Sequence, residues 1–374
     1  MTLAVTRPRE STVVLAVLAV ISCVVAGGAY VYNGQHLDFR LFYLEGVASR
    51  HGQPLYAGGQ ALNLNPPSLT IAVFAPLSVL PYYFAQGLWL GLTIGGIAAS
   101  VRLVRRELAL SIEQTIRMTA LLLLMHGSFE AIVLGQLTFP LLIYPVTRAW
   151  QAYRHRRLVN AGAWLAPVVL VKPPMALLAI ALAPFTWMTA ASFSAAATAL
   201  TMVLTGTAPW RAWLQAGGQV DWLARPFNLS LWGVAARFTG PRAGIGDLSS
   251  WWVIAILLVA LVTWAQTIRE ANPDRRFFFA GLWSLLLTPL GWGYYLPLLL
   301  GPAMAAWPRS RLALVAYAFT WLPVGGTAAG HHHPLIDSLG FVGLAVAWLV
   351  WTIRPPAVRL ASNTLQPISP PASR

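Results

Sequence analysis

The chain has 374 residues, of which 57% are hydrophobic and 10% charged, whereas soluble domains carry about 25% charged residues. This composition excludes a cytosolic enzyme, a secreted disulfide scaffold and a disordered chain, because a water-soluble globule could not bury so much apolar surface. The net charge is +14, and all 25 basic residues except Lys172 are arginine. The arginines form short clusters between apolar runs, which favours positive-inside membrane topology over nucleic-acid binding. The single cysteine, Cys23, forms no intramolecular disulfide.

The apolar runs predict an all-α, polytopic membrane protein of about 12 transmembrane helices with both termini in the cytoplasm. Thr12 to Tyr32 is expected to be a retained anchor, because the run is long and lacks a convincing cleavage site. Residues 66–80 are expected to form a short re-entrant or juxtamembrane helix, since a full crossing would put later arginine clusters on the wrong side. Further spans are expected near 84–101, 117–134, 137–151, 158–171, 173–187, 189–205, 250–268, 277–290, 294–307, 311–323 and 335–353.

Two polar segments, 33–65 and 206–249, are expected to lie outside the membrane, the first carrying short juxtamembrane helices. They contain four of the 11 acidic residues. Three helix breaks with polar residues are expected on the same outer side, at 134–136, 171–174 and 288–292. We expect residues 1–374 to form a single integral-membrane domain with a disordered tail over 354–374.

Asp38 follows the first span and is the first acidic residue of the outer side. A carboxylate half-shielded by aromatic neighbours has a raised pKa and is suited to general-base catalysis. The alternative is that Asp38 only caps the helix that follows it. In a helix over 38–50, Asp38 and Glu45 would share a face about 10 Å apart, too far to share one proton.

Lys172 lies in apolar sequence between Val171 and two prolines. An ionisable residue at membrane depth indicates a functional site, and a fixed cation near the outer face suits a lipid phosphate. The alternative is a lysine that extends its ammonium to the membrane surface.

Three further patterns leave two interpretations each. His126 and Glu130 lie four apart on one helix face, as a structural pair or a proton relay. Asn228-Leu229-Ser230 matches a glycosylation pattern within a segment rich in Arg and Trp, which is either an interfacial helix or a surface for a carbohydrate or lipid headgroup. Residues 331–333 are three histidines, whose spacing matches no common zinc site and favours a polar loop cap.

Several short motifs follow one another in a distinctive order. They are Asp38-Phe39 with Phe42-Tyr43, Gly52-Gln53-Pro54-Leu55-Tyr56, Asn65-Pro66-Pro67, Ala75-Pro76-Leu77, Leu134-Gly135-Gln136, Ala161-Gly162, Lys172-Pro173, Asn228-Leu229-Ser230 with Gly233 and Arg237, and Thr288-Pro289 with Trp292. Over about residues 30–300 this order resembles the mannosyltransferase-like branch of the GT-C superfamily. It is most similar to the mycobacterial phosphatidylinositol-mannoside mannosyltransferases.

This resemblance implies a membrane glycosyltransferase that moves a hexose, expected to be mannose, from a polyprenyl-phosphate sugar to a lipid or glycan acceptor at the outer face of a bacterial cytoplasmic membrane. It implies Asp38 as the general base, with inversion at the anomeric carbon. We expect Lys172 first and Arg237 second to hold the donor phosphate. The expected substrate-binding residues are Tyr43, Glu130, Gln136, Asn228, Trp292 and Tyr294.

In two places the sequence departs from the family's pattern: Thr138 occupies the stretch where an Asn often follows the Gly-Gln pair, and Tyr294 stands where a His is usual. No residues are assigned to a metal, although some GT-C enzymes use a divalent ion and others do not. The absence of a Gly-rich phosphate loop and of an Asp-x-Asp pair disfavours a soluble nucleotide as substrate.

The main alternative is a transporter or lipid flippase without bond chemistry. Many transporters contain an internal repeat and broken helices at the middle of the membrane. No convincing repeat is present here, and the predicted polar breaks gather at one face. A structural subunit of an envelope complex also fits the composition, but it gives no reason for acidic and basic residues to converge outside the membrane.

Overall fold

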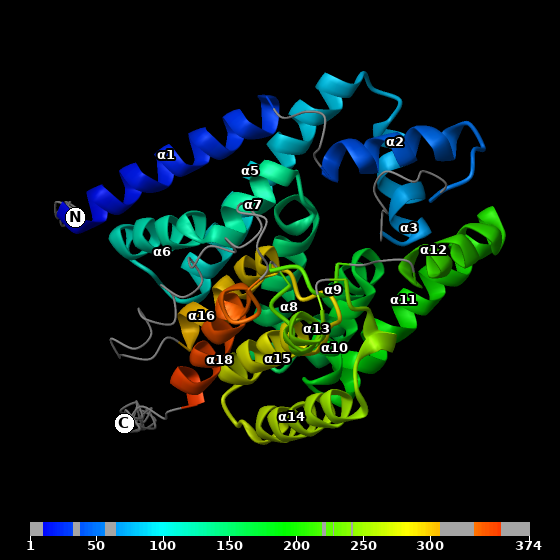
Figure 1. The fold of residues 1–374 in the computed structure, drawn as a ribbon. Helices are drawn as coiled ribbons and strands as arrows, with labels where there is room; N and C mark the ends of the chain where they lie inside the picture. The colour runs from blue at the N-terminus through cyan, green and yellow to red at the C-terminus, as the bar shows by residue number, and fades with distance from the viewer. Residues whose placement is uncertain are drawn as a thin grey trace, which may run out of the picture.

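The computed structural model describes residues 10–32, 38–56, 65–218, 222–226, 228–240, 242–306 and 333–352. Within these residues the regular structure is helical, and one isolated β-bridge joins Asn228 to Trp292. The helices form a bundle, with α1 and α2 on one side of it and α14 on the other (Figure 1). The all-α prediction is therefore confirmed for the described residues.

Among the described residues, four helices are long and apolar enough to cross a membrane: α1 (Glu10–Tyr32), α5 (Tyr82–Glu107), α11 (Pro184–Thr205) and α14 (Ser250–Arg269). Only between 11% and 22% of the most apolar part of each helix is buried inside the protein. An apolar surface left so exposed is stable only in contact with lipid. These helices therefore support the prediction of a multi-pass membrane protein.

The expected number of about 12 full spans is not confirmed, because the described residues contain four such helices, or five when a bent pair is included. The pair is α6 (Ile112–Leu124) and α7 (His126–Leu134), which meet at an angle of 65°. Other apolar runs form helices too short for a straight crossing of about 20 residues. These are α8 (Ile143–Arg154), α9 (Leu158–Val171), α10 (Ala176–Ile180), α15 (Pro273–Leu287), α16 (Leu300–Ala305) and α18 (Leu339–Thr352).

Proline explains one wrong boundary. The runs 173–187 and 189–205 were expected to be separate spans, but the first contains only η3 (Pro173–Met175) and α10, and α11 already begins at Pro184. Ala183 is extended, as expected for a residue before proline. The run expected at 311–323 and the tail over 354–374 lie outside the described residues.

The first outer segment contains α2 (Asp38–Arg50) and is followed by a short helical stretch made of α3 (Pro67–Leu69), η1 (Thr70–Phe74) and α4 (Ala75–Leu77). This confirms the short helix expected over 66–80. The two pack closely, since a β-carbon on Gly46 would lie 2.1 Å from the carbonyl oxygen of Phe74. The second outer segment contains α12 (Ala208–Gly218), α13 (Leu231–Thr239) and η4 (Ile245–Asp247).

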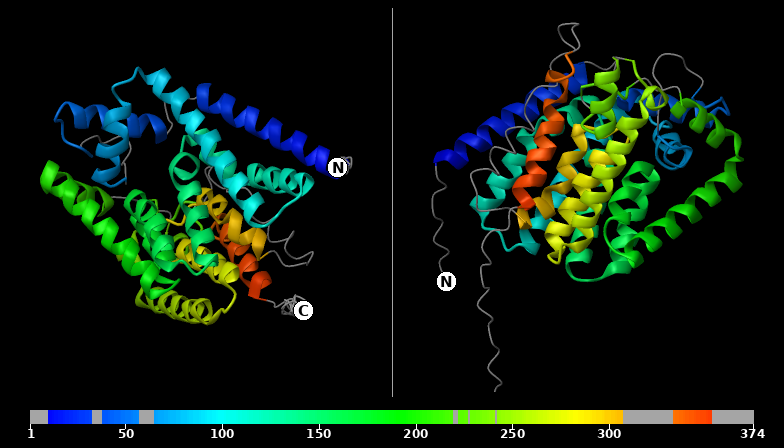
Figure 2. Two further views of the ribbon diagram at one scale, coloured as in Figure 1. Left: turned by 180° about the vertical axis from the view of Figure 1, so that it is seen from behind. Right: turned by 60° about the horizontal axis from the view of Figure 1, so that its bottom comes forward.

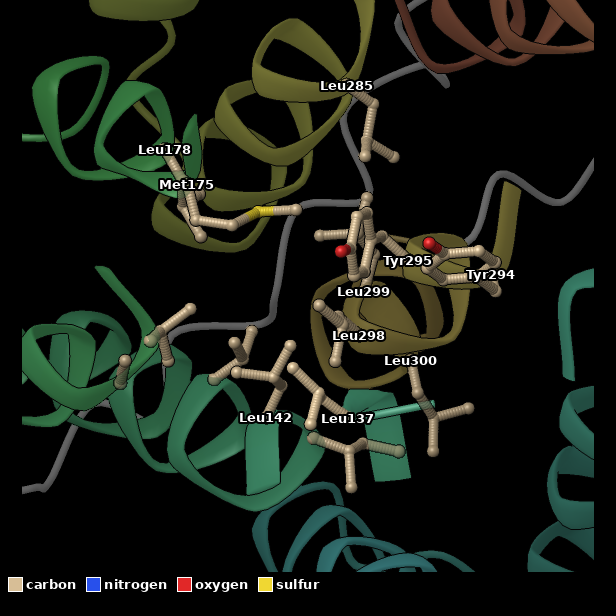
Figure 3. Packing of buried hydrophobic residues seen from close by; sticks show 14 of the residues in the cluster. Leu137, Leu142, Met175, Leu178, Leu285, Tyr294, Tyr295, Leu298, Leu299 and Leu300 are labelled. Atoms are coloured by element: carbon tan, nitrogen blue, oxygen red, sulfur yellow. The ribbon is translucent and has the colours of Figure 1, made fainter. Parts of the chain in front are cut away.

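The centre of the bundle is α15, which is buried at every position from Phe277 to Leu286. A helix that is apolar on all sides belongs in the interior. It packs against α10, α14, α16 and α8. In Figure 3, Leu298 and Leu299 of η5 (Gly293–Leu299) and the adjacent Leu300 lie between two groups of apolar side chains. One group contains Leu137 and Leu142, at the segment around η2 (Thr138–Leu142), and the other contains Met175, Leu178 and Leu285.

Three of the arginine-bearing segments meet at one end of the bundle. Arg154, the last residue of α8, contacts Glu107 at the end of α5 at 3.5 Å and Asp274 at the start of α15 at 3.4 Å. We call this the basic end. From it, α9 runs to Lys172 and packs against both α8 and α11. Figure 2 shows the bundle from two further directions. At 1.5 Å per residue, the 14 residues of α9 separate the two ends by about 20 Å.

Candidate active site

Asp38 is the first residue of α2, and its carboxylate accepts a hydrogen bond from the side-chain amide of Gln136. The two segments meet because Phe39 is fully buried against Gly135, where an added β-carbon would lie 2.7 Å from the Cβ of Phe39. Gly135 also ends α7 in a left-handed conformation, with φ of 68°. The predicted break at 134–136 is therefore present, and it places Gln136 beside Asp38.

Lys172 marks the second predicted break. The helix α9 ends at Val171, the backbone of Lys172 is extended, and η3 begins at Pro173. The ammonium donates a hydrogen bond of 2.8 Å to the side-chain oxygen of Asn65, which is fully buried. The partly buried Lys172 therefore has a specific partner in the first outer segment, which a lysine that only extends to the membrane surface would not need.

Asp38 and Lys172 interact electrostatically, and among the described residues no salt bridge joins them. Burial raises the pKa of Asp38 to about 6, against the charge of Lys172 and the hydrogen bond from Gln136, which both lower it. Burial lowers the pKa of Lys172 to about 8, against the charge of Asp38. Near pH 7 the site therefore holds a mostly ionised carboxylate and a mostly protonated amine that are not in direct contact.

A cavity of about 360 Å³ opens beside Lys172. Its walls come from the break after α9, from α12 and from the third predicted break, which follows α15 at Thr288. Trp213, Trp292 and Tyr295 provide aromatic surface. A lysine in a mostly apolar cavity suits a ligand that combines a negative group with apolar or sugar-ring faces.

The aromatic wall continues toward Asp38. The ring of Tyr294 stacks on Trp292 with centroids 5.9 Å apart and packs edge-on against Tyr295 at 4.8 Å. Both tyrosines interact electrostatically with Asp38, and Tyr294 does so with Glu130. The structure thus stacks Tyr294 on Trp292 and brings Tyr294 within electrostatic range of both Asp38 and Glu130.

Glu130 also pairs with His126, whose Nε2 lies 3.2 Å from the carboxylate. The predicted pairing of the two residues on one helix face is confirmed. Both side chains are partly exposed. The pair therefore belongs to the edge of the site, and the choice between a structural pair and a proton relay stays open on geometry.

Asn228 connects two loops and has no free hydrogen-bonding group on its side chain. Its Nδ2 donates to the carbonyls of Leu223 and Pro289 at 2.9 and 2.7 Å, and its Oδ1 accepts from the backbone of Gly291 at 2.9 Å and of Ser230 at 3.2 Å. The residue is fully buried. It therefore fixes the loop that carries Trp292, and in this structure it is inaccessible both as a glycosylation acceptor and as a direct ligand.

Arg237 makes three hydrogen bonds within the protein, and its Nη2 is buried without a hydrogen-bond partner among the described residues. Its Nη1 donates to the carbonyls of Arg225 and Asn228 at 2.9 and 3.0 Å, and its Nε donates to Ser338 at 3.0 Å. Burial lowers the pKa of Arg237 to about 10, against the charge of Asp337. It does not line the cavity beside Lys172, so its contacts fit a role in holding α13 to the segment before α18.

Tyr43 lies one turn after Asp38 in α2, but its hydroxyl donates to the carbonyl of Leu80 at 2.8 Å. Its ring packs against Phe39 at 6.3 Å and Tyr82 at 5.2 Å. These contacts hold α2 against the start of α5. The structure therefore places Tyr43 in the support of Asp38.

Four residues of the site were not assigned from the sequence: Asn65, Trp213, Thr288 and Tyr295. Within the described residues, the hydroxyl of Thr288 is buried without a hydrogen-bond partner. Asn65 and Thr288 belong to motifs noted above, and each directly precedes a proline. That position is the only sequence signal that favoured them.

No group of three or more His, Cys, Asp or Glu side chains is placed to hold a metal ion in the part of the chain that the structure describes. Of the three histidines, His331 and His332 lie outside the described residues. The carbonyl of His333 accepts a hydrogen bond of 2.9 Å from the backbone of Asp337.

The comparisons with known proteins give one match. The family model described as Glycosyltransferase family 87 matches residues 63–290, which is more than half of the chain. No curated protein and no solved structure matches. The match includes Lys172, Gln136 and the loop around Asn228, while Asp38 lies before it.

Proposed function

The chain belongs to glycosyltransferase family 87 and is a membrane glycosyltransferase, and from that premise we propose that it transfers a hexose from a polyprenyl-phosphate sugar to a lipid or glycan acceptor. We take the sugar to be mannose, by the resemblance of the motifs. Asp38 is the general base, and the reaction takes place at the outer face of the membrane, opposite the basic end.

In this mechanism the carboxylate of Asp38 removes the proton from the acceptor hydroxyl. The hydroxyl oxygen attacks the anomeric carbon from the face opposite the phosphate, so a β-linked donor gives an α product. The bond between that carbon and the phosphate oxygen breaks, and its electron pair leaves with the polyprenyl phosphate. The pKa of Asp38, raised to about 6, leaves it ionised near neutral pH and basic enough to accept a proton.

The proposed role of Lys172 is to stabilise the departing phosphate. A phosphate leaving group needs charge stabilisation more than it needs a proton, and a fixed ammonium in a partly water-excluded site provides it. Asn65 holds the ammonium in place through its 2.8 Å hydrogen bond. Trp292 and Tyr295 line the cavity beside it and suit the faces of a sugar ring or the first isoprene units.

The observation that carries this proposal is that a mostly ionised carboxylate and a mostly protonated amine lie in one site without a salt bridge among the described residues, beside a cavity of about 360 Å³. A purely structural pair would be expected to form a direct salt bridge. Each buried charge loses its hydration, and only close contact with the opposite charge offsets that loss. We infer that the two charges act on different reacting groups, the acceptor hydroxyl and the donor phosphate.

In this proposal Gln136 orients Asp38 through its hydrogen bond to the carboxylate. Glu130, Trp292 and Tyr294 keep their predicted substrate-binding roles, because they lie around the same site. Tyr43, Asn228 and Arg237 take supporting roles, since their polar groups bind backbone carbonyls or Ser338. A divalent ion remains compatible with the proposal. The transporter alternative is not favoured, because family 87 is a family of glycosyltransferases.

The experiment is to incubate the purified protein with radiolabelled polyprenyl-phosphate mannose and membrane lipid extract, and to follow label into new glycolipid. Parallel reactions with polyprenyl-phosphate glucose test the sugar, and reactions with a chelator test metal dependence. Transfer that Asp38→Asn abolishes would support the proposal. Donor turnover that is equal in wild type and Asp38→Asn would contradict the role of Asp38.

A further inference from the structure

A second cavity, of about 260 Å³, lies at the basic end, far from Asp38. It is formed where α8 turns into α9, and its lining includes Arg148 and Gln151 of α8, His155 and Arg157 of the turn, and Trp164 of α9. The reaction proposed above makes no use of this cavity. Because α9 begins here and ends next to Lys172, the two sites lie at opposite ends of one helix.

The cavity combines positive charge with a fixed guanidinium. Arg148 lies over the ring of Trp164, 5.2 Å from its centroid, and donates to the side-chain oxygen of Gln151 at 2.9 Å. Its Nε is buried without a hydrogen-bond partner among the described residues. An arginine held by stacking on an aromatic ring, with donors left over, is suited to a phosphate.

The neighbouring carboxylate does not neutralise Arg148 or Arg157. Glu107 accepts hydrogen bonds from His155 at 2.6 Å and from Gln151 at 2.9 Å. Its carboxylate is also 3.5 Å from Arg154. Within the described residues neither Arg148 nor Arg157 forms a salt bridge. The cavity is therefore positively charged in the absence of a ligand.

The position of the cavity indicates where the phosphate comes from. It opens at the first turn of an apolar helix, beside the exposed Arg156 and Arg157, and the ring of Tyr144 packs edge-on against Trp164 at 5.9 Å. Tryptophan and tyrosine next to arginine are typical of the level of the lipid headgroups. Basic pockets between membrane helices bind the headgroups of anionic lipids.

We propose that this cavity binds the phosphate of an anionic phospholipid, held by Arg148 and Arg157 with the ring of Trp164 beneath the guanidinium. The bound lipid would be a structural ligand of the α8–α9 turn and not a substrate. This inference is independent of the transfer reaction, because none of its residues belongs to the site of Asp38 and Lys172.

The test is native mass spectrometry of the purified full-length protein, titrated with phosphatidylglycerol, with diacylglycerol of the same acyl chains, and with inorganic phosphate. We expect wild type to retain phosphatidylglycerol and not diacylglycerol. The double variant Arg148→Gln, Arg157→Gln should bind phosphatidylglycerol about tenfold more weakly or worse. The matched control is Arg105→Gln, Arg106→Gln, which removes two exposed charges from the end of α5, and it should bind like wild type.

Equal losses in the two double variants would show diffuse charge attraction and overturn the proposal, as would unchanged binding in both. Equal binding of diacylglycerol would show that the acyl chains, not the phosphate, are recognised. Binding of inorganic phosphate that depends on Arg148, without binding of the phospholipid, would refute a lipid source. If the double variant fails to fold, as judged by size exclusion, the exposed Arg157→Gln compared with Arg106→Gln gives the same decision.

Discussion

Gln136 donates a hydrogen bond to the carboxylate of Asp38 although 98 positions separate them in the chain. The contact fixes one carboxylate oxygen toward the break after α7. Lys172 affects the same carboxylate by its charge. Asp38 is therefore oriented by one neighbour and charge-balanced by another, which is the arrangement expected of a positioned base.

Asp38→Asn should abolish most of the transfer. The amide is nearly the same size as the carboxylate but cannot accept the acceptor's proton, so we expect a rate loss of about 10²- to 10⁴-fold. The measurement is the initial rate of labelled glycolipid formation, with thermal unfolding of the purified protein to check the fold. The control is Glu113→Gln, in the first turn of α6, which should keep the wild-type rate; a similar loss there would point to a general charge effect.

The pH profile should be bell-shaped. Transfer needs ionised Asp38, so it should rise as the pH passes about 6, and it needs protonated Lys172, so it should fall as the pH passes about 8. Lys172→Gln removes a charge that lowers the pKa of Asp38. The acidic limb should then move to higher pH and the alkaline limb should disappear. An alkaline limb that persists in Lys172→Gln would show that another group causes it.

Gln136→Leu should move the acidic limb alone. The hydrogen bond from Gln136 lowers the pKa of Asp38, so its loss should raise that pKa and shift the limb upward, while Lys172 and the alkaline limb stay as they are. Rates measured across the pH range separate this effect from misfolding, which would lower the rate at every pH. A profile that keeps its acidic limb in place would contradict the role given to Gln136.

The sequence predicted Lys172 for a physical reason, because an ionisable residue in apolar sequence is costly and indicates a functional site. Asp38 was predicted from its place after the first span and from the resemblance, and Gln136 from its place at a polar helix break and from the resemblance. The same reasoning could not separate a ligand-binding residue from a polar group satisfied by its own backbone. Asn228 and Arg237 looked like binding residues, yet their side chains bind carbonyls several residues away. The two roles can be distinguished only from the hydrogen bonds that these side chains form in the folded structure.

The number of spans could not be established from hydropathy for a related reason. Hydropathy measures how apolar a run is, but not where its helix stops. The run after Lys172 is apolar throughout, yet α10 ends at Ile180 and α11 begins at Pro184. Asn65 was not assigned because its partner, Lys172, is 107 positions away, and no local pattern indicates such a contact.

Gly135→Ala should destabilise the packing of the α7 end against α2, which positions Asp38. Alanine at φ of 68° is strained, and its β-carbon would lie 2.7 Å from both Phe39 and Tyr30. We expect a loss of about 2–4 kcal/mol in the free energy of unfolding, from the backbone strain and the overpacking together. Thermal unfolding in detergent measures it. Gly95→Ala is the control, because nothing lies within 4 Å of an added β-carbon in the middle of α5; equal destabilisation of the two variants would contradict the packing argument.

Asn228→Ala should destabilise the loop that carries Trp292. It leaves two buried carbonyls and two buried N–H groups without the side chain that pairs them, and each unsatisfied group costs about 1–3 kcal/mol. We expect a loss of about 3 kcal/mol or more in the free energy of unfolding. Asn228→Asp keeps the oxygen that accepts from Ser230 and Gly291. It places a buried, negatively charged acceptor against the carbonyls of Leu223 and Pro289, so its loss should be at least as large.

Thermal unfolding of both variants, together with the KM for the polyprenyl-phosphate sugar, distinguishes a loop anchor from a direct ligand. If Asn228 is an anchor, transfer should decline in step with stability, and Asn228→Asp should lose at least as much as Asn228→Ala in both measurements. An Asn228→Ala protein with wild-type stability and a strongly raised KM would instead mean that the side chain leaves its four partners to bind substrate.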